Sequence, residues 1–171
     1  MRETAENTRQ KWLRDPEAES VTAMVENAPD HMIATVYLRF VYQHVANCAA
    51  ESLARFELTP SRYFALFQLM ISPDGQMPVG RISELIFVHP ATITSTIDQL
   101  QKAGLVRRMA SDEDRRIILA KITPAGRALT QQATEALDQN FFGLAPMTAE
   151  EAAELRFLLK RVWARLSTAA D

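Results

Sequence analysis

Two adjacent arginines are the residues of this sequence whose chemistry stands out first. Arg115 and Arg116 lie in SDEDRRIILAKITPAG, residues 111–126, between three acidic residues and an apolar run. A guanidinium group is always charged and donates up to five hydrogen bonds, so it suits phosphate and carboxylate groups. The charged stretch 110–116 around the pair predicts a loop between two strands. The pair either forms a solvated surface or contacts an anionic partner.

An anionic partner must be bound by local charge, because the net charge of the whole chain is −2 at pH 7. Other basic residues lie near the pair in the sequence: Lys102, Arg107, Arg108, Lys121 and Arg127. The acidic residues among them are Asp112, Glu113 and Asp114. A local basic patch in a near-neutral chain is typical of proteins that bind nucleic acid.

The elements that must position these arginines follow from the hydrophobic pattern. A short helix is expected over 79–86, a tight break over 87–89, and a second helix over 90–103 with Gly104 just after it. The period then changes to that of two strands, 105–109 and 117–122. Two helices joined by a tight turn and followed by a hairpin make a winged helix-turn-helix. In that unit the second helix enters the major groove of DNA.

The second predicted helix has an apolar face and a polar face. The apolar face holds Ile93, Ile97 and Leu100 and belongs to the core. The polar side chains that could meet DNA are Thr92, Thr94, Ser95 and Gln99. Hydroxyl and amide groups reach base edges and phosphates, although the same face could be plain surface. Helical rotation makes Thr96 and Asp98 weaker candidates.

Longer helices flank this unit. One is expected from Asp30 to about Phe56, a second from Thr123-Pro124 towards Asn140, and a third from the capping box of Thr148 and Glu151 to about Leu166. The first is longer than most globular helices, which favours an oligomer. The predicted fold class is mostly α with a small β-hairpin wing. The expected parts are a polar arm (1–28), a dimerisation helix (29–57), a DNA-binding lobe (58–123) and C-terminal dimerisation helices (124–171).

On these residues the chain resembles the multiple-antibiotic-resistance regulator (MarR) family. The matching pieces are LTPSRYFALFQL, RISELIFVHPATITSTIDQLQKAGLV, and the charged loop with its Asp-x-Arg and following Thr-Pro-Ala-Gly. The resemblance covers roughly residues 30–168. It implies a homodimeric transcriptional regulator of double-stranded DNA, most often a repressor. Such a repressor is released from a pseudo-palindromic operator by a small molecule, for example an aromatic or phenolic one.

The resemblance also implies roles for the residues of the charged loop. Arg116 matches the wing-tip arginine that enters the minor groove, whose negative potential attracts a guanidinium. Asp114 would hold that arginine by a charge-assisted hydrogen bond. Arg115, Arg107 and Arg108 would contact phosphates or support the wing. The sequence departs from the family at three positions: Phe87 replaces the glycine of the turn and predicts a differently shaped turn, His89 replaces the common Ser or Asp cap, and Ser95 replaces a common arginine.

A small-molecule pocket between the dimerisation and DNA-binding lobes is a further implication of the resemblance. The side chains that could line it are Tyr37, Phe40, His44, Tyr63 and Phe67, with Arg39 or Arg62 offering charge to an acid. A lone histidine on an apolar helix face, such as His44, is more often a core residue. Cys48 is either a redox-sensing thiol, as in some relatives, or a buried structural thiol; reactivity needs exposure and nearby positive charge.

Several classes of protein are disfavoured by the sequence. The single cysteine excludes an intrachain disulfide framework and a zinc finger, and the three scattered histidines give no metal-site spacing. No nucleophile–base set, paired carboxylates or Gly-rich phosphate loop points to an enzyme, so we expect neither metal nor cofactor. The polar N-terminus and the lack of a spanning apolar run predict a cytoplasmic protein without membrane contact. A winged-helix protein–protein module without DNA binding is the alternative.

Overall fold

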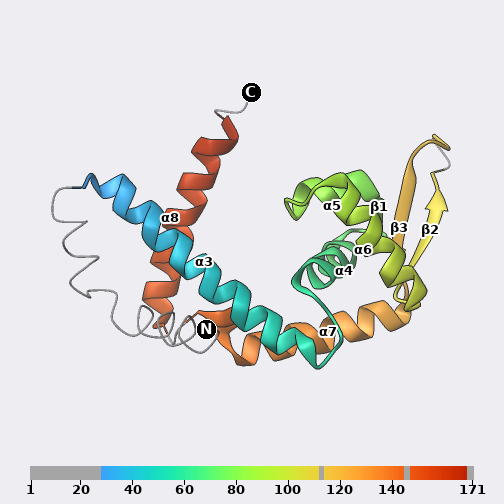
Figure 1. Cartoon of the computed structure of the whole chain (residues 1–171), viewed down its shortest axis with the longest axis horizontal. Helices are drawn as coiled ribbons and strands as arrows, with labels where there is room; N and C mark the ends of the chain where they lie inside the picture. The colour runs from blue at the N-terminus through green and yellow to red at the C-terminus, as the bar shows by residue number, and fades with distance from the viewer. Residues whose placement is uncertain (1–27, 112–113, 145–146, 169–171) are drawn as a thin grey trace, which may run out of the picture. The chain divides into compact units, whose positions relative to one another are not determined.

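The computed structural model describes residues 28–111, 114–144 and 147–168. It is mostly helical, with a three-stranded antiparallel sheet (Figure 1). Contacts divide the chain into two units, residues 1–43 and 44–171. The predicted arm, apart from residue 28, lies outside the described residues, as do Asp112 and Glu113 of the wing.

The first described helix, α3, spans Asp30–Ala54 and buries Ala49 and Leu53. It ends two residues before the predicted end, because Glu57 takes a left-handed φ of 55° and the Leu58 amide donates back to the carbonyl of Leu53. This backbone reversal ends the helix by satisfying one of its last carbonyls.

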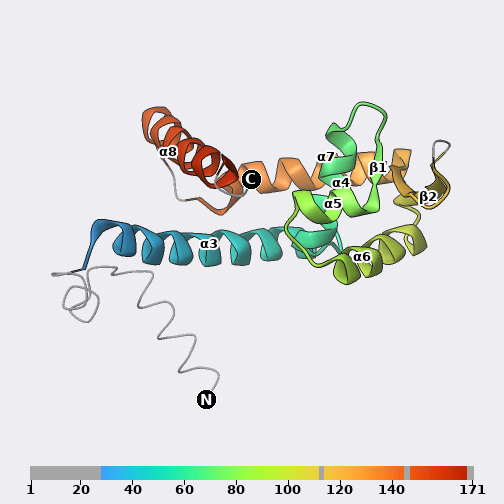
Figure 2. The same ribbon diagram turned by 90° about the horizontal axis from the view of Figure 1, so that it is seen from above.

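The core of the C-terminal unit is built on α4, Pro60–Ile71, which begins where the sequence predicts. The Thr59 hydroxyl accepts a hydrogen bond from the Arg62 amide at 3.3 Å, and Pro60 takes the first helical position. The helix buries Tyr63, Leu66 and Leu69. It packs on one side against α6 and on the other against α7 (Figures 1 and 2).

The helix-turn-helix consists of α5, Val79–Leu85, and α6, Pro90–Lys102. Phe87 in the turn takes a strained left-handed φ of 54°, a conformation that a glycine would adopt easily. The residue is 75% exposed, and the edge of its ring contacts the ring of Trp163, with centroids 5.5 Å apart. The buried Ser83 closes the turn by donating its hydroxyl to the Val88 carbonyl at 2.7 Å. His89 caps α6, with Nδ1 accepting from the Ala91 amide at 3.2 Å.

The predicted hairpin is present as β2, Val106–Ala110, and β3, Ile118–Ile122. A third strand, β1, Gln76–Pro78, pairs with the other edge of β3, so the strand order is β1-β3-β2. The sequence prediction of a two-stranded hairpin missed β1, because three residues ending in proline carry no readable alternation. The sheet stands beside α6 and carries the wing (Figure 1).

The chain leaves the wing through the predicted Thr-Pro-Ala-Gly motif and enters α7, Pro124–Gln139. The Thr123 hydroxyl accepts from the Gly126 amide at 3.0 Å and donates to the Gly104 carbonyl at 2.8 Å. Gly126 lies so close to the backbone that an added Cβ would be 2.2 Å from the Leu105 carbonyl oxygen. The motif therefore both starts the helix and packs it against the start of the wing.

Two further elements complete the described chain, a 3₁₀ helix at Phe141–Gly143 and α8 at Ala149–Thr168. The predicted capping box precedes α8: the Thr148 amide donates to Glu151, and the Glu151 amide donates to the Thr148 hydroxyl. No side chain of α8 is buried. None of the helices in the described residues combines the length and apolar character needed to span a bilayer.

Candidate nucleic-acid interface

The second helix of the helix-turn-helix, α6, separates its residues as the sequence predicts. Its core face buries Ile93, Ile97 and Leu100. The four predicted DNA-binding residues, Thr92, Thr94, Ser95 and Gln99, are all exposed. Thr96 is buried, and its hydroxyl donates to the Thr92 carbonyl at 2.9 Å. Beyond its first residue, Pro90, the exposed face thus offers mainly hydroxyl and amide groups.

Arg108 joins the wing to α6. Its guanidinium forms an ion pair with Asp98 at 2.8 Å and donates to the Thr94 carbonyl at 3.3 Å. The Arg108 side chain is only 28% exposed, so water screens this pair less than an ordinary surface pair. Of the two roles considered for Arg108, the geometry fits support of the wing. Asp98, which sequence reasoning set aside, supplies the carboxylate.

The tip of the wing is shaped by Asp114. Its carboxylate accepts from the backbone amide of Arg116 at 2.8 Å, and its carbonyl accepts from the Ile117 amide at 2.9 Å. The expected hydrogen bond between Asp114 and Arg116 is present, and its donor is the backbone amide of Arg116. A short acidic side chain reaches the amide two residues ahead in its own turn more readily than the end of a long side chain. Asp114 therefore fixes the turn that presents Arg115 and Arg116, both exposed.

Arg62 lies at this surface rather than in a pocket. Its Nε and one terminal nitrogen donate to the Gln99 side-chain oxygen at 3.0 and 2.6 Å, and the other terminal nitrogen donates to the Glu57 carbonyl at 3.1 Å. Sequence reasoning assigned Arg62 to the ligand pocket. Positions 62 and 99 are 37 residues apart, so no local pattern predicts their contact. Arg107, the last of the residues predicted to contact DNA, is exposed on β2.

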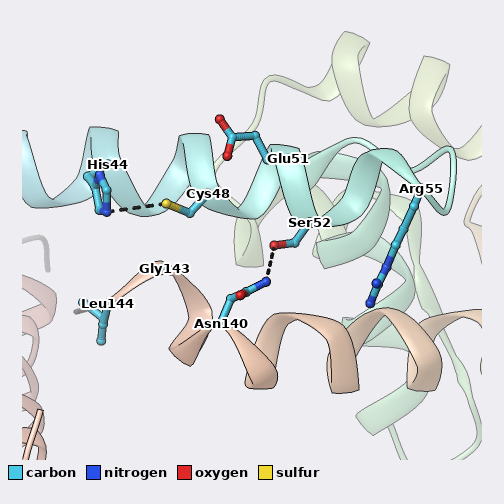
Figure 3. Close-up of a pocket in the computed structure, with 8 residues that line it drawn as sticks. All are labelled: His44, Cys48, Glu51, Ser52, Arg55, Asn140, Gly143 and Leu144. Carbon is cyan, nitrogen blue, oxygen red and sulfur yellow. Dashed lines mark hydrogen bonds between the residues drawn. The ribbon is translucent and has the colours of Figure 1, made fainter. Parts of the chain in front are cut away.

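A separate cavity of about 470 Å³ lies in the C-terminal unit (Figure 3). The residues that line it are His44, Cys48, Glu51, Ser52, Arg55, Asn140, Gly143 and Leu144. His44 Nε2 lies 3.5 Å from Cys48 Sγ, and the Asn140 amide donates to the Ser52 hydroxyl at 3.1 Å. Cys48 is partly exposed rather than fully buried. The cavity wall is therefore mainly polar.

Of the seven residues predicted for a ligand pocket, His44 alone lines this cavity. Tyr63 is in the core, where its hydroxyl meets Thr134 at 3.0 Å; burial raises the pKa of Tyr63, and this hydrogen bond opposes the shift. Phe67 packs against the core. Tyr37, Arg39 and Phe40 belong to the N-terminal unit and are exposed.

The helical side of the cavity had a readable signal that sequence reasoning missed. His44, Cys48 and Ser52 recur at steps of four, with Glu51 and Arg55 at the matching steps of three and four. They therefore share one face of α3. The facing residues Asn140, Gly143 and Leu144 are also three and four positions apart, but they lie at and beyond the C-terminal cap of α7.

A polar helix beside a basic hairpin, on a helix-turn-helix core, defines the class of winged helix-turn-helix DNA-binding proteins. A model of the MarR family matches residues 58–118. A MarR family transcriptional regulator from Streptomyces coelicolor, Sco5413, is 30% identical; the match covers 82% of this chain and 98% of that one, with a TM-score of 0.74. This chain belongs to the MarR family of DNA-binding transcriptional regulators, and the family is one of regulators rather than enzymes.

Two further proteins are similar to this chain, one in fold and one over about half of the sequence. A MarR variant from E. coli, solved in complex with operator DNA, is 24% identical, covers 75% of this chain and 91% of that one, and has a TM-score of 0.66; this likeness concerns the fold alone. The regulator PecS from Dickeya dadantii is 36% identical over 84 residues, 48% of this chain. The chain spans 51% of the length of PecS, and 60% of that of an uncharacterised regulator from Bacillus subtilis.

Proposed function

We propose that the protein is a homodimeric transcriptional repressor that a small molecule releases from a pseudo-palindromic operator. The observation that carries this proposal is the surface formed by the exposed polar face of α6 and the exposed arginines of the wing. In this proposal α6 enters the major groove with Thr92, Thr94, Ser95 and Gln99. The wing places Arg116 in the adjacent minor groove.

Counterion release supplies most of the binding free energy in this proposal. The exposed cations around α6 and the wing include Lys102, Arg107, Arg115, Arg116 and Lys121. Each phosphate that such a residue neutralises makes the slope of the logarithm of the binding constant against the logarithm of the salt concentration more negative by roughly 0.9. Base contacts from hydroxyl and amide groups then select among sequences.

A second copy of the chain is the proposed partner of the flanking helices, with residues 29–57 and 124–171 supplying the interface and 58–123 binding DNA. The support is the apolar surface of α8, where Phe157, Leu158, Val162, Trp163 and Leu166 are each more than half exposed. In the N-terminal unit, Met32, Leu38 and Tyr42 of α3 are also more than half exposed. Apolar groups on this scale favour burial against another chain. A dimer would read two half-sites about one helical turn apart.

The cavity at His44 and Cys48 is the proposed effector site. Its volume suits a small aromatic molecule, and Arg55 and the Asn140 amide offer charge and hydrogen bonds to a phenolic or carboxylate group. Such an effector releases DNA only if it binds the DNA-incompetent arrangement of the dimer more tightly. The ring of Tyr63, which sequence reasoning placed here, has a structural role instead.

A thiol-based redox sensor is the second candidate, and one observation favours it. Cys48 Sγ lies 3.5 Å from His44 Nε2 beside a cavity, so the thiol has a polar neighbour and an oxidant can reach it. Peroxide treatment would then release DNA from the wild type and leave the Cys48→Ser variant bound. Release by peroxide in both proteins would exclude this role for Cys48.

The test of the main proposal is a binding titration. Fluorescence anisotropy measures the affinity of the purified protein for DNA from upstream of its own gene. The repressor proposal expects tight binding that outcompetes random DNA, by a particle with the mass of a dimer. It also expects that a screen of aromatic acids will identify a compound that dissociates the protein from the DNA. A folded dimer that binds neither this DNA nor genomic fragments would overturn the proposal in favour of a protein–protein module.

A further inference from the structure

The amide of Gln99 is held in one orientation by Arg62. Two N–H groups of the Arg62 guanidinium converge on the Gln99 side-chain oxygen, at 3.0 and 2.6 Å. Arginine has donors and no acceptor, so the Gln99 atom that faces it must be the oxygen. The orientation thus follows from the chemistry of the two side chains as well as from their positions.

Arg62 is itself fixed from behind. Its third hydrogen bond goes to the carbonyl of Glu57 at 3.1 Å, at the left-handed turn that ends α3. Its backbone amide donates to the Thr59 hydroxyl that caps α4. The guanidinium therefore bridges the start of α4 and the exposed face of α6. This anchoring reduces the entropy that Arg62 loses when it holds Gln99.

The consequence for Gln99 is that its acceptor is occupied while its NH₂ group remains at an exposed position of α6. A free glutamine recognises adenine with two hydrogen bonds, accepting from N6 and donating to N7. Gln99 has both acceptor positions of its oxygen engaged, so it cannot form that pair. It can donate to bases whose major-groove edge offers acceptors, and guanine offers two, O6 and N7.

We propose that Arg62 is a positioning residue that makes Gln99 a donor-only reader, so that the protein selects guanine over adenine at the base pair facing Gln99. This inference rests on the proposed entry of α6 into the major groove. Arg62 acts through Gln99 and does not read the base itself. The nearby Asp98 is held separately by Arg108 and leaves the Gln99 amide untouched.

The test is to select preferred sites from a randomised DNA library with the full-length protein, and then to measure affinity for all four bases at each position of the preferred site. Gln99→Ala identifies the relevant position, because base preference should disappear there and persist elsewhere. The wild type is expected to prefer guanine at that position.

Replacing Arg62 by Met frees the Gln99 oxygen while keeping an unbranched side chain of similar length. The expected result is a change from guanine to adenine preference at the same position. A bidentate pair discriminates by about fivefold or more, so the ratio of the two affinities should move by at least that factor. In the double variant Arg62→Met, Gln99→Ala, the position should show no preference. Arg62→Lys keeps the positive charge but loses the paired donors, so it should shift preference in the same direction even if the Met variant folds poorly.

Lys102→Met is the matched control, because it removes an exposed cation from the last turn of α6 and leaves the hydrogen bonds of Arg62 to Gln99 in place. It should weaken binding to every sequence by the same factor and reduce the salt slope by about 1. The same uniform loss in the Arg62 variants, without any change of base preference, would make Arg62 a phosphate contact and overturn the proposal. Adenine preference in the wild type at the Gln99 position would also overturn it. A wild type that selects no sequence at all would instead refute the repressor function on which the proposal rests.

Discussion

Replacement of Gly126 by alanine tests how the wing is joined to α7. An alanine Cβ would lie 2.2 Å from the Leu105 carbonyl oxygen and 3.0 Å from the Ile122 side chain, whereas ordinary contacts begin near 3.4 Å. The neighbouring atom is backbone, so no side-chain rotation relieves the overlap. The helix start or the first strand of the wing must move by about 1 Å in a closely packed region.

The size of the effect is a balance of two terms. Overpacking costs about 1–3 kcal/mol or more, and alanine in place of glycine inside a helix returns about 1 kcal/mol. We expect the free energy of unfolding to fall by about 2 kcal/mol, since a backbone clash of this size lies at the upper end of the overpacking range and the gain of about 1 kcal/mol is subtracted from it. For a chain of this length that lowers Tm by roughly 4–8 °C.

The matched control is Gly80→Ala in α5, where an added Cβ meets nothing within 4 Å. It should leave Tm unchanged or raise it by about 2 °C through helix propensity. Both variants are compared with the wild type by differential scanning calorimetry at one protein concentration, because Tm of an oligomer depends on concentration. Equal Tm values for Gly126→Ala and Gly80→Ala would refute the close packing of the motif against the wing.

Three further predictions concern other contacts. Arg108→Met should lower the free energy of unfolding by about 1 kcal/mol, because Asp98 loses its partner; denaturant titration measures this, and an unchanged midpoint would exclude a supporting role. Phe87→Gly should leave Tm within a few degrees of the wild type, since the relief of about 1–3 kcal/mol of left-handed strain offsets the loss of the ring contact with Trp163, worth about 0.5–1.5 kcal/mol; a much lower Tm would show that the ring contact outweighs the strain. Burial raises the pKa of Tyr63 in the folded state, so the folded state keeps that proton more tightly than the unfolded chain. Protonated Tyr63 therefore makes its full contribution to the free energy of unfolding below pH 10. That contribution falls as pH rises above about 10, the pKa of tyrosine in the unfolded chain. Thermal melts from pH 8 to 11 should show a smaller alkaline loss for Tyr63→Phe than for the wild type, and parallel curves would contradict the assignment.

The helix starts could be predicted from the sequence because each depends on residues within four positions. Thr59 with Pro60, Thr123 with Gly126, and Thr148 with Glu151 all form the predicted caps. The two faces of α6 followed from periodicity in the same way, since a helix repeats every 3.6 residues.

The features that escaped prediction depend on residues far apart in the chain or on backbone geometry. The contact of Arg62 with Gln99, and the pairing of β1 with β3, join segments that have no common pattern. Asp114 was given the right partner, Arg116, but the family pattern does not say that the donor is the backbone amide. The strain at Phe87 was foreseen, but its ring contact with Trp163 was not, because the two residues lie far apart in the chain.

The central claim is that the wing arginine contacts DNA, and the salt dependence of binding tests it most directly. Wild type, Arg116→Ala and Lys160→Ala would be titrated against the same operator fragment from 50 to 200 mM salt; Lys160 is an exposed cation of α8, outside the proposed surface. We predict that Arg116→Ala weakens binding at least tenfold at low salt and reduces the logarithmic salt slope by about 1, while Lys160→Ala matches the wild type. Identical affinities and slopes for all three proteins would contradict a wing that binds DNA through Arg116.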